Sequence, residues 1–172
     1  MLKTGNINRY SLILLLFTLL GIISCRNEET IKQIKNLTGK HIRMPQKISR
    51  QSEFAIVNYV DTTGCTSCKL RPTQWNTFIE NAKKQNILID VIFIVHPNVY
   101  SDVKEIIRSN CKDIIVLKDD KNRWIKEHAL PHNEMLHTFL IDGSNNVVII
   151  GTPTTNKKIG KMMLDYCISK EI

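Results

Sequence analysis

Residues 54–70 read FAIVNYVDTTGCTSCKL, and this stretch decides the fold. Apart from Asn58, its first seven residues are apolar and largely β-branched or aromatic, as in a strand that is buried on both faces of a sheet. Two cysteines separated by two residues, Cys65 and Cys68, follow shortly after this run. Apolar residues then recur at helical spacing, at Trp75, Phe78, Ile79 and Ala82. The cysteines therefore stand where a buried strand turns into a helix.

The rest of the chain continues this alternation. We expect further strands at residues 87–95, 114–117, 138–141 and 147–150, and the last two flank turn residues as in a hairpin. Helices are expected between Pro97 and Asn110, around residues 122–128 and at residues 155–169, with a short one near residues 31–37. The β-α-β opening requires a parallel pair of strands, whereas the hairpin supplies an antiparallel pair. The sequence therefore predicts an α/β fold whose mixed central sheet has helices on both faces.

Composition and charge restrict the class of protein. The 172 residues suffice for one packed domain, and the 42% hydrophobic content argues against disorder. The formal net charge is +8, but the lysines and arginines are spread along the chain. Because no basic run is interleaved with aromatic residues, we expect solvated faces and no nucleic-acid partner.

The N-terminal residues have the layout of an export signal. Lys3 and Arg9 precede an apolar stretch that ends near Ile23 and is too short to span a bilayer. Residues 22–25, Ile-Ile-Ser-Cys, resemble the lipobox of bacterial lipoproteins. That resemblance implies a signal peptide at residues 1–24, lipidation of Cys25 and membrane attachment through the lipid. We then expect residues 25–51 to form the lipidated N-terminus and a tether, and residues 52–172 to form the folded domain.

This leader also predicts where the protein is found. A lipid anchor of this kind places it in the cell envelope, in the periplasm or at the outer membrane. The tail Arg26-Asn27-Glu28-Glu29 is similar to the acidic export signal of surface-displayed lipoproteins in some Gram-negative lineages, which adds surface exposure as a further option.

The paired cysteines carry the strongest chemical signal. The free amides and positive dipole end of a helix favour the thiolate of its first cysteine, and Lys69 and Arg71 add positive charge. Cys65 is therefore the expected nucleophile, and Cys68, about one turn on, is placed to resolve a mixed disulfide. Asp61 is a candidate acid-base helper for proton transfer at Cys68, with formation of a turn as the alternative.

The order of these elements resembles that of thioredoxin-like proteins of the TlpA and redoxin type. It consists of the strand, the cysteine pair, an α-β insertion and a closing β-β-α unit. The resemblance covers residues 54–169 and implies a three-layer thioredoxin-like domain at residues 52–172. It further implies a thiol-disulfide oxidoreductase in which Cys65 attacks and Cys68 resolves, with no cofactor. The expected partners are protein thiols and disulfides or a membrane electron donor.

Three positions depart from that family's pattern. Gly64 stands where the family usually has a tryptophan before the first cysteine, which leaves the sulfur more exposed. Leu136 stands where the family has a cis-proline, which affects substrate docking and opens the cysteines to metals. Pro72 comes four residues after Cys68 instead of five, and its ring is expected to disturb the helix there.

Other functions fit some of the same residues. Copper-delivery proteins of the Sco type share this fold, so His137 or His132 could complete a metal site with the two cysteines. The plainer interpretation of His137 is that it packs or hydrogen-bonds beside the active site. Thr62 stands three residues before Cys65, as in peroxiredoxins, but Asn58 replaces their proline. A third alternative is a binding module with a structural disulfide, although a disulfide that closes so short a loop adds little stability to a fold.

The remaining cysteines and the large side chains are expected in the core. Cys111 and Cys167 are interpreted as small buried hydrophobes, with a disulfide between them as an unsupported alternative. Four further residues are expected to be core residues and not part of a cofactor site, namely Trp75, Trp124, Met162 and Met163.

Overall fold

The computed structural model describes residues 28–63 and 70–170. The chain divides into two compact units, Met1–Asn36 and Leu37–Ile172. The described part of the first unit, residues 28–36, is helical, as the spacing of Ile31 and Ile34 predicts. The second unit holds the sheet. Cys25, Lys69 and the pair Cys65 and Cys68 lie outside the described residues, so their placement stays a prediction.

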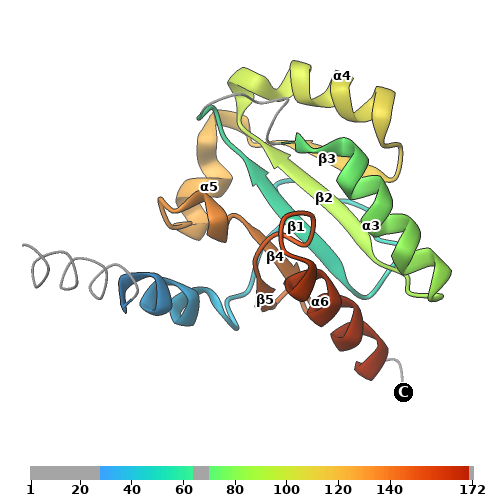
Figure 1. Ribbon diagram of the computed structural model, residues 1–172. Helices are drawn as coiled ribbons and strands as arrows, with labels where there is room; N and C mark the ends of the chain where they lie inside the picture. The colour runs from blue at the N-terminus through green and yellow to red at the C-terminus, as the bar shows by residue number, and fades with distance from the viewer. Residues whose placement is uncertain (1–27, 64–69, 171–172) are drawn as a thin grey trace, which may run out of the picture. The chain divides into compact units, whose positions relative to one another are not determined.

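A five-stranded mixed sheet forms the centre of the second unit (Figure 1). Its strand order is β3-β2-β1-β4-β5, with β1 parallel to β2, β2 parallel to β3, and antiparallel pairing from β1 to β4 and from β4 to β5. The expected topology is therefore confirmed. The strands are β1 (Ala55–Val60), β2 (Asp90–Val95), β3 (Ile114–Lys118), β4 (Thr138–Ile141) and β5 (Val147–Ile150).

The helices follow the expected ranges closely. They are α3 (Pro72–Lys84), α4 (Tyr100–Asn110), α5 (Arg123–His128) and α6 (Lys157–Lys170), with short 3-10 turns η1 (Pro97–Val99), η2 (Asp120–Asn122) and η3 (Glu134–Leu136). α3 has Pro72 at its first turn, where the missing amide proton costs nothing. The preceding Arg71 has a left-handed backbone instead of a helical one. The disturbance expected near Cys68 lies outside the described residues and stays a prediction.

Each face of the sheet has its own core, because successive residues of a strand point to opposite faces. In β1, Ile56 and Val60 join one core and Val57 and Tyr59 join the other. α3, α4 and α6 cover the first face, and α5 with residues 37–48 covers the second. This gives the predicted three-layer arrangement, with the sheet between two helical layers.

Residues before the expected domain boundary at 52 belong to the second unit. Leu37 and Ile42 are buried in the second core. The backbone nearby pairs with the chain leading into β5, since the Gly39 amide donates to the Val147 carbonyl at 2.7 Å and the Val147 amide donates to the Lys40 carbonyl at 2.9 Å. Packing thus extends into the expected tether of residues 25–51, while the division into leader, tether and domain stays a prediction.

A buried carboxylate holds the start of α5. Asp119, which follows β3, accepts from the Trp124 amide at 2.7 Å and from the Ile125 amide at 3.2 Å. Its side chain also accepts from the Tyr59 hydroxyl of β1 at 3.3 Å. Asp119 satisfies amides that α5 would otherwise leave unpaired, and it ties that helix to the central strand.

His128 at the end of α5 joins the helix to residues 40–43. Its Nδ1 lies 2.9 Å from the Trp124 carbonyl, and its Nε2 accepts from the Arg43 amide at 2.9 Å. A carbonyl can only accept, so Nδ1 carries the proton and the ring is neutral. Burial lowers the pKa of His128 from its ordinary value of 6.5, and the charges of Lys40 and Arg43 act in the same direction. Protonation would remove the acceptor that the Arg43 amide uses.

This histidine predicts a loss of stability in mild acid. Because its folded-state pKa lies below 6.5, the unfolded chain takes up the proton first, and the free energy of unfolding falls as pH drops below about 6.5 by at most about 1.4 kcal/mol per pH unit. Urea unfolding between pH 8 and pH 5 measures this slope. His128→Gln should flatten it, whereas His132→Gln, at an exposed position, should not. An unchanged slope in His128→Gln would contradict the assignment.

The orientation of α6 differs from the expectation in one respect. Trp75, Trp124 and Met163 are buried as predicted, but Met162 is 55% exposed, so its assignment to the core was wrong. The buried face of α6 consists of Gly160, Met163, Leu164 and Cys167. A Cβ at Gly160 would lie 3.3 Å from the Pro153 carbonyl oxygen and 3.5 Å from the Phe78 ring. The helix therefore approaches α3 through a glycine, which an apolar pattern does not reveal.

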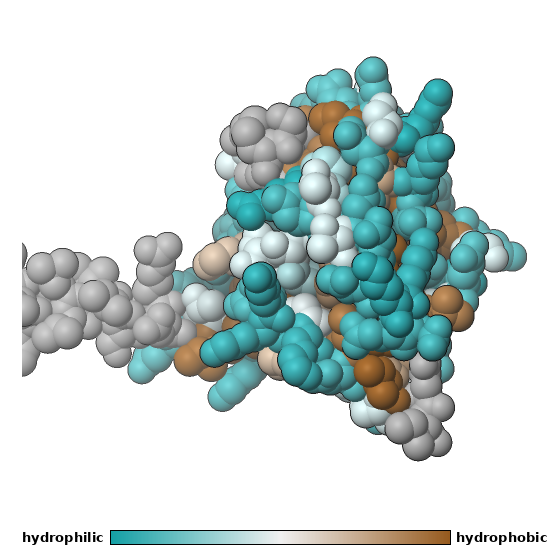
Figure 2. All heavy atoms as spheres, turned by 45° about the vertical axis from the view of Figure 1, so that its right-hand side comes forward, coloured by the Kyte–Doolittle hydropathy of each residue, from teal (hydrophilic) through white to brown (hydrophobic). Residues whose placement is uncertain are grey.

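Figure 2 shows one face of the molecule covered largely by hydrophilic side chains, with hydrophobic atoms exposed in separate small areas. No helix among the described residues is long and apolar enough to cross a membrane.

Candidate active site

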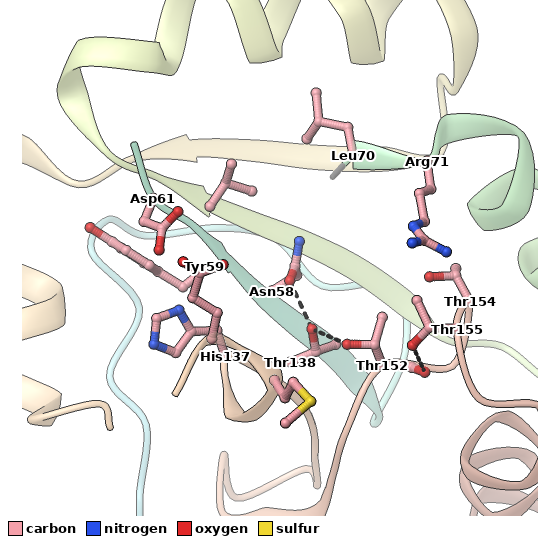
Figure 3. Close-up of a pocket in the computed structure, with 13 residues that line it drawn as sticks. Asn58, Tyr59, Asp61, Leu70, Arg71, His137, Thr138, Thr152, Thr154 and Thr155 are labelled. Atoms are coloured by element: carbon pink, nitrogen blue, oxygen red, sulfur yellow. Dashed lines mark hydrogen bonds between the residues drawn. The ribbon is translucent and has the colours of Figure 1, made fainter. Parts of the chain in front are cut away.

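A pocket of about 400 Å³ lies at the carboxyl end of β1. The residues on both sides of the cysteine motif line it, with Asp61 before the motif and Leu70 and Arg71 after it. The other walls come from η3, the start of β4 and residues 152–155 (Figure 3). The chain therefore passes from this pocket into the cysteine motif after Asp61 and is back at the pocket at Leu70.

Asp61 forms a turn at the end of β1. Its Oδ1 accepts from the Thr63 amide at 3.0 Å, which is an Asx turn. The turn-forming alternative for Asp61 is therefore confirmed. The carboxylate also lines the pocket, so a role in proton transfer at Cys68 stays a prediction.

His137 is buried beside the same pocket. Its Nε2 lies 2.7 Å from the Pro131 carbonyl, and its ring meets the Tyr59 ring edge to face at 5.8 Å between centroids. Because the carbonyl only accepts, Nε2 carries the proton and Nδ1 is the nitrogen left for a proton or a metal. Packing and hydrogen bonding beside the site, the plainer interpretation of His137, is confirmed. His132 is exposed and lines a neighbouring pocket of about 450 Å³ together with His137.

One wall of the pocket is a chain of hydroxyl and amide groups that the sequence did not reveal. Thr138 donates to Asn58 Oδ1 at 2.8 Å, and Thr152 donates to Thr138 Oγ1 at 3.0 Å. Asn58 and Thr138 are paired residues of β1 and β4. Asn58 is the one amide in an apolar run, and a polar residue in its partner strand is the signal that could have linked them. The wall offers uncharged polar contacts to a substrate.

Tyr59 also lines the pocket, although its hydroxyl is committed elsewhere. Burial and the neighbouring Asp119 carboxylate raise its pKa well above the ordinary value of 10. Its ring stacks on Trp124 at 5.7 Å between centroids. Tyr59 thus stays protonated and serves to position α5 and His137 around the site.

Leu136, the residue that the sequence resemblance places at the cis-proline position, is buried at the end of η3. None of the described residues has a cis peptide bond. The preceding Met135 lines the pocket with 68% of its surface exposed. The backbone at this point therefore follows a 3-10 turn.

Cys111 and Cys167 take no part in this site. Both are buried, without a disulfide within the described residues, in the core that α3, α4 and α6 cover. Burial raises the pKa of the Cys111 thiol, which keeps it protonated and unreactive. The interpretation of both as small buried hydrophobes is confirmed. Within residues 28–63 and 70–170, no cluster of three or more histidine, cysteine or acidic side chains is placed to hold a metal.

Comparisons with known proteins rest on structure. No protein-family model matches the sequence. No curated protein matches it either.

Among solved structures, a thioredoxin-like protein from Bacteroides caccae superposes with a TM-score of 0.54 at 15% identity, covering 85% of this chain and 56% of that one. The chain thus spans little more than half the length of that relative. A DsbE-type thiol:disulfide interchange protein from Chlorobium tepidum gives a TM-score of 0.51 at 13% identity, covering 67% and 80% of the two chains.

A copper protein has the same architecture. Yeast Sco1 with copper bound superposes with a TM-score of 0.51 at 15% identity, covering 69% of this chain and 77% of that one. At this identity the likeness is one of fold alone. The chain described here therefore has a thioredoxin-like fold of the kind found in thiol-disulfide oxidoreductases.

Proposed function

We propose that this protein is a thiol-disulfide oxidoreductase that uses Cys65 and Cys68. The observation that carries the proposal is the pocket at the end of β1, which is bordered by residues on both sides of the motif. A thioredoxin-like fold supports it, because solved relatives of that fold include thiol-disulfide interchange proteins.

The proposed chemistry is two successive exchanges. The Cys65 thiolate attacks one sulfur of a substrate disulfide, forms a mixed disulfide and releases the other sulfur as a thiolate. The Cys68 thiolate then attacks Cys65, which releases the substrate's second thiolate and leaves an oxidised Cys65–Cys68 pair. Two electrons pass to the substrate, and a dithiol of a membrane or soluble partner restores them. The reverse sequence oxidises a substrate dithiol.

Charged groups around the pocket support the first step. The positive charges of Arg71 and Lys69 would favour the thiolate of Cys65 electrostatically. The positive end of the helix that is expected to begin at the cysteine motif would act in the same direction. Asp61 and His137 lie on the pocket wall, where either is placed to exchange a proton with the leaving sulfur. These helper roles are part of the proposal.

Lipid anchoring at Cys25 completes the proposed function. It would hold the enzyme in the cell envelope, in the periplasm or at the outer membrane, with surface display as the further option. Protein thiols and disulfides, or a membrane electron donor, would be its partners. Attachment by two or three acyl chains is strong enough to be stable without a spanning helix. Metabolic labelling with a palmitate analogue, with Cys25→Ala as the control, tests this part.

A redox titration tests the proposed reaction. The purified full chain in detergent is equilibrated with thiol-disulfide buffers, alkylated and mapped by mass spectrometry. We expect a reversible Cys65–Cys68 couple with a potential of roughly −270 to −120 mV, the range of thioredoxin-fold enzymes. A pair that stays oxidised well below about −300 mV, or never forms, would contradict the proposal.

Copper binding is the second candidate. The observation in its favour is His137, whose Nδ1 is not committed to the protein and whose ring lines the pocket next to the motif. Cysteine sulfur and imidazole suit copper. Tight, stoichiometric binding of Cu(I) that is lost in Cys65→Ser, Cys68→Ser and His137→Ala would favour this function over exchange.

A further inference from the structure

The pocket at the end of β1 is lined by two carboxylates, those of Asp61 and Glu134, and by the guanidinium of Arg71. Figure 3 shows Asp61 and His137 on one side and the Arg71 guanidinium on the other, directed toward Thr154. Both sides border the place where the chain enters or leaves the cysteine motif. A substrate sulfur that reaches the motif therefore brings its neighbouring groups between these charges.

Arg71 is a cation without an ionic partner among the described residues. The ion pairs there join other side chains. The first turn of α3, which begins directly after Arg71, contains no acidic residue. The positive end of that helix adds to the charge of the guanidinium. This side of the pocket therefore attracts an anion.

The backbone at Arg71 is left-handed, as it is at five other non-glycine residues of the described chain. Its φ of 46° and ψ of 53° are strained for a residue that has a side chain. The next residue is Pro72, and a proline disfavours helical backbone at the residue before it, which here is Arg71. Glycine or asparagine would relieve part of this strain, so stability does not explain an arginine at this position.

Two threonines lie beside the exposed Arg71 side chain (Figure 3). Thr154 and Thr155 line the pocket, and the Thr154 hydroxyl is buried without a hydrogen-bond partner among the described residues. Buried polar atoms are almost always paired, so an orphan beside a pocket needs an explanation. A carboxylate bound by Arg71 would supply the missing partner after a rotation of the Thr154 side chain.

We propose that Arg71 binds a carboxylate that neighbours the reacting sulfur of the substrate, so that the site prefers anionic disulfides. The inference rests on the proposed function and names the substrate class of the same site. Arg71 would hold the carboxylate while the Cys65 thiolate bonds to the nearer sulfur and the farther sulfur leaves as a thiolate. The carboxylate comes either from a small disulfide of the cystine type or from an acidic residue beside a cysteine in a polypeptide.

Two disulfides of similar size test this preference. The reduced full chain is mixed with 3,3′-dithiodipropionate, which carries two carboxylates, or with neutral 2-hydroxyethyl disulfide, at about 0.15 M ionic strength to screen long-range attraction. The ratio of the two rate constants is compared between the wild type and Arg71→Gln. Any effect of Arg71 on the Cys65 thiolate changes both rates alike and cancels in the ratio.

We expect the ratio to fall about fivefold in Arg71→Gln, as for a partly exposed ion pair, and to be kept largely in Arg71→Lys. Lys158→Gln, an exposed cation that does not line the pocket, should leave it unchanged. A ratio in Arg71→Gln that stays within twofold of the wild type, both here and with the peptide pair described next, overturns the inference but leaves the enzyme intact. If a folded wild type reacts with neither compound nor with any disulfide peptide, the proposed function itself fails.

The source of the carboxylate is decided by a second pair of substrates. Disulfide-linked peptides that differ only in Glu or Gln next to the cysteine are compared in the same way. A fall in the ratio with dithiodipropionate alone indicates a small-molecule substrate, and a fall with the peptides, alone or as well, indicates a polypeptide with an acidic neighbour. If neither ratio falls, Arg71 does not recognise a carboxylate.

Discussion

Cys65→Ser abolishes disulfide exchange, whereas Cys68→Ser still attacks a substrate once and then remains joined to it. The thiolate is the nucleophile and a serine hydroxyl stays protonated at neutral pH, so the loss at position 65 should be at least about a thousandfold. Without Cys68 the mixed disulfide has no nearby thiol to resolve it. Non-reducing electrophoresis with mass mapping should show a covalent adduct for Cys68→Ser and none for Cys65→Ser.

Cys111→Ala is the matched control for this pair. Its thiol is buried and has a raised pKa, so exchange should continue at the wild-type rate. Exchange that survives in Cys65→Ser would remove the enzymatic proposal. If the double variant of Cys65 and Cys68 also keeps the biological function of the protein, a binding module is the better description.

Asp119→Ala should lower the free energy of unfolding by about 3 kcal/mol or more. The side chain is 1% exposed and accepts from two amides of α5 and from the Tyr59 hydroxyl. Alanine leaves all three donors buried and unpaired, at roughly 1–3 kcal/mol for each such group before relaxation. Urea unfolding followed by circular dichroism measures the difference.

The neighbouring Asp120 provides the control. It is exposed, and its one ion pair within the described chain, to Lys118 at 3.6 Å, also lies on the surface. Asp120→Ala should therefore change stability by less than about 0.5 kcal/mol. Equal effects of the two alanine variants would show that Asp119 does not hold α5 to the sheet. Asp119→Asn should fall in between, since one oxygen remains as an acceptor.

The fold could be predicted because its strands and helices are encoded locally. The run from Phe54 to Val60 is buried on both faces, and the spacing of Trp75, Phe78 and Ile79 gives a single apolar stripe. The turn between β4 and β5 is equally local, since Asp142 accepts from the Ser144 amide at 2.9 Å and from the Asn146 amide at 2.8 Å. Such patterns can be recognised from the sequence because they depend only on residues that lie close together in the chain.

The rotation of α6 could not be predicted in the same way. The spacing of Ile159, Met162, Met163, Tyr166 and Cys167 predicts one apolar face. Met163 and Cys167 are buried as that spacing predicts, but Met162 is exposed, and Gly160 and Leu164 are buried. A shift of one residue moves a helical face by about 100°. The choice depends on the close approach to Phe78 of α3, which is a contact between distant parts of the chain.

Local sequence patterns predicted the order of the elements, the mixed sheet and the position of the cysteine pair after β1. They did not predict that Thr152 and Asn58 are joined through Thr138, that Asp119 accepts from amides of α5, or that Arg71 lies beside Thr154 at the pocket. The two kinds of feature differ in how far apart in the sequence the interacting residues lie. Periodicity and turn chemistry act over a few residues, whereas a pocket joins side chains from segments whose distance is fixed only when strands pair and both cores close.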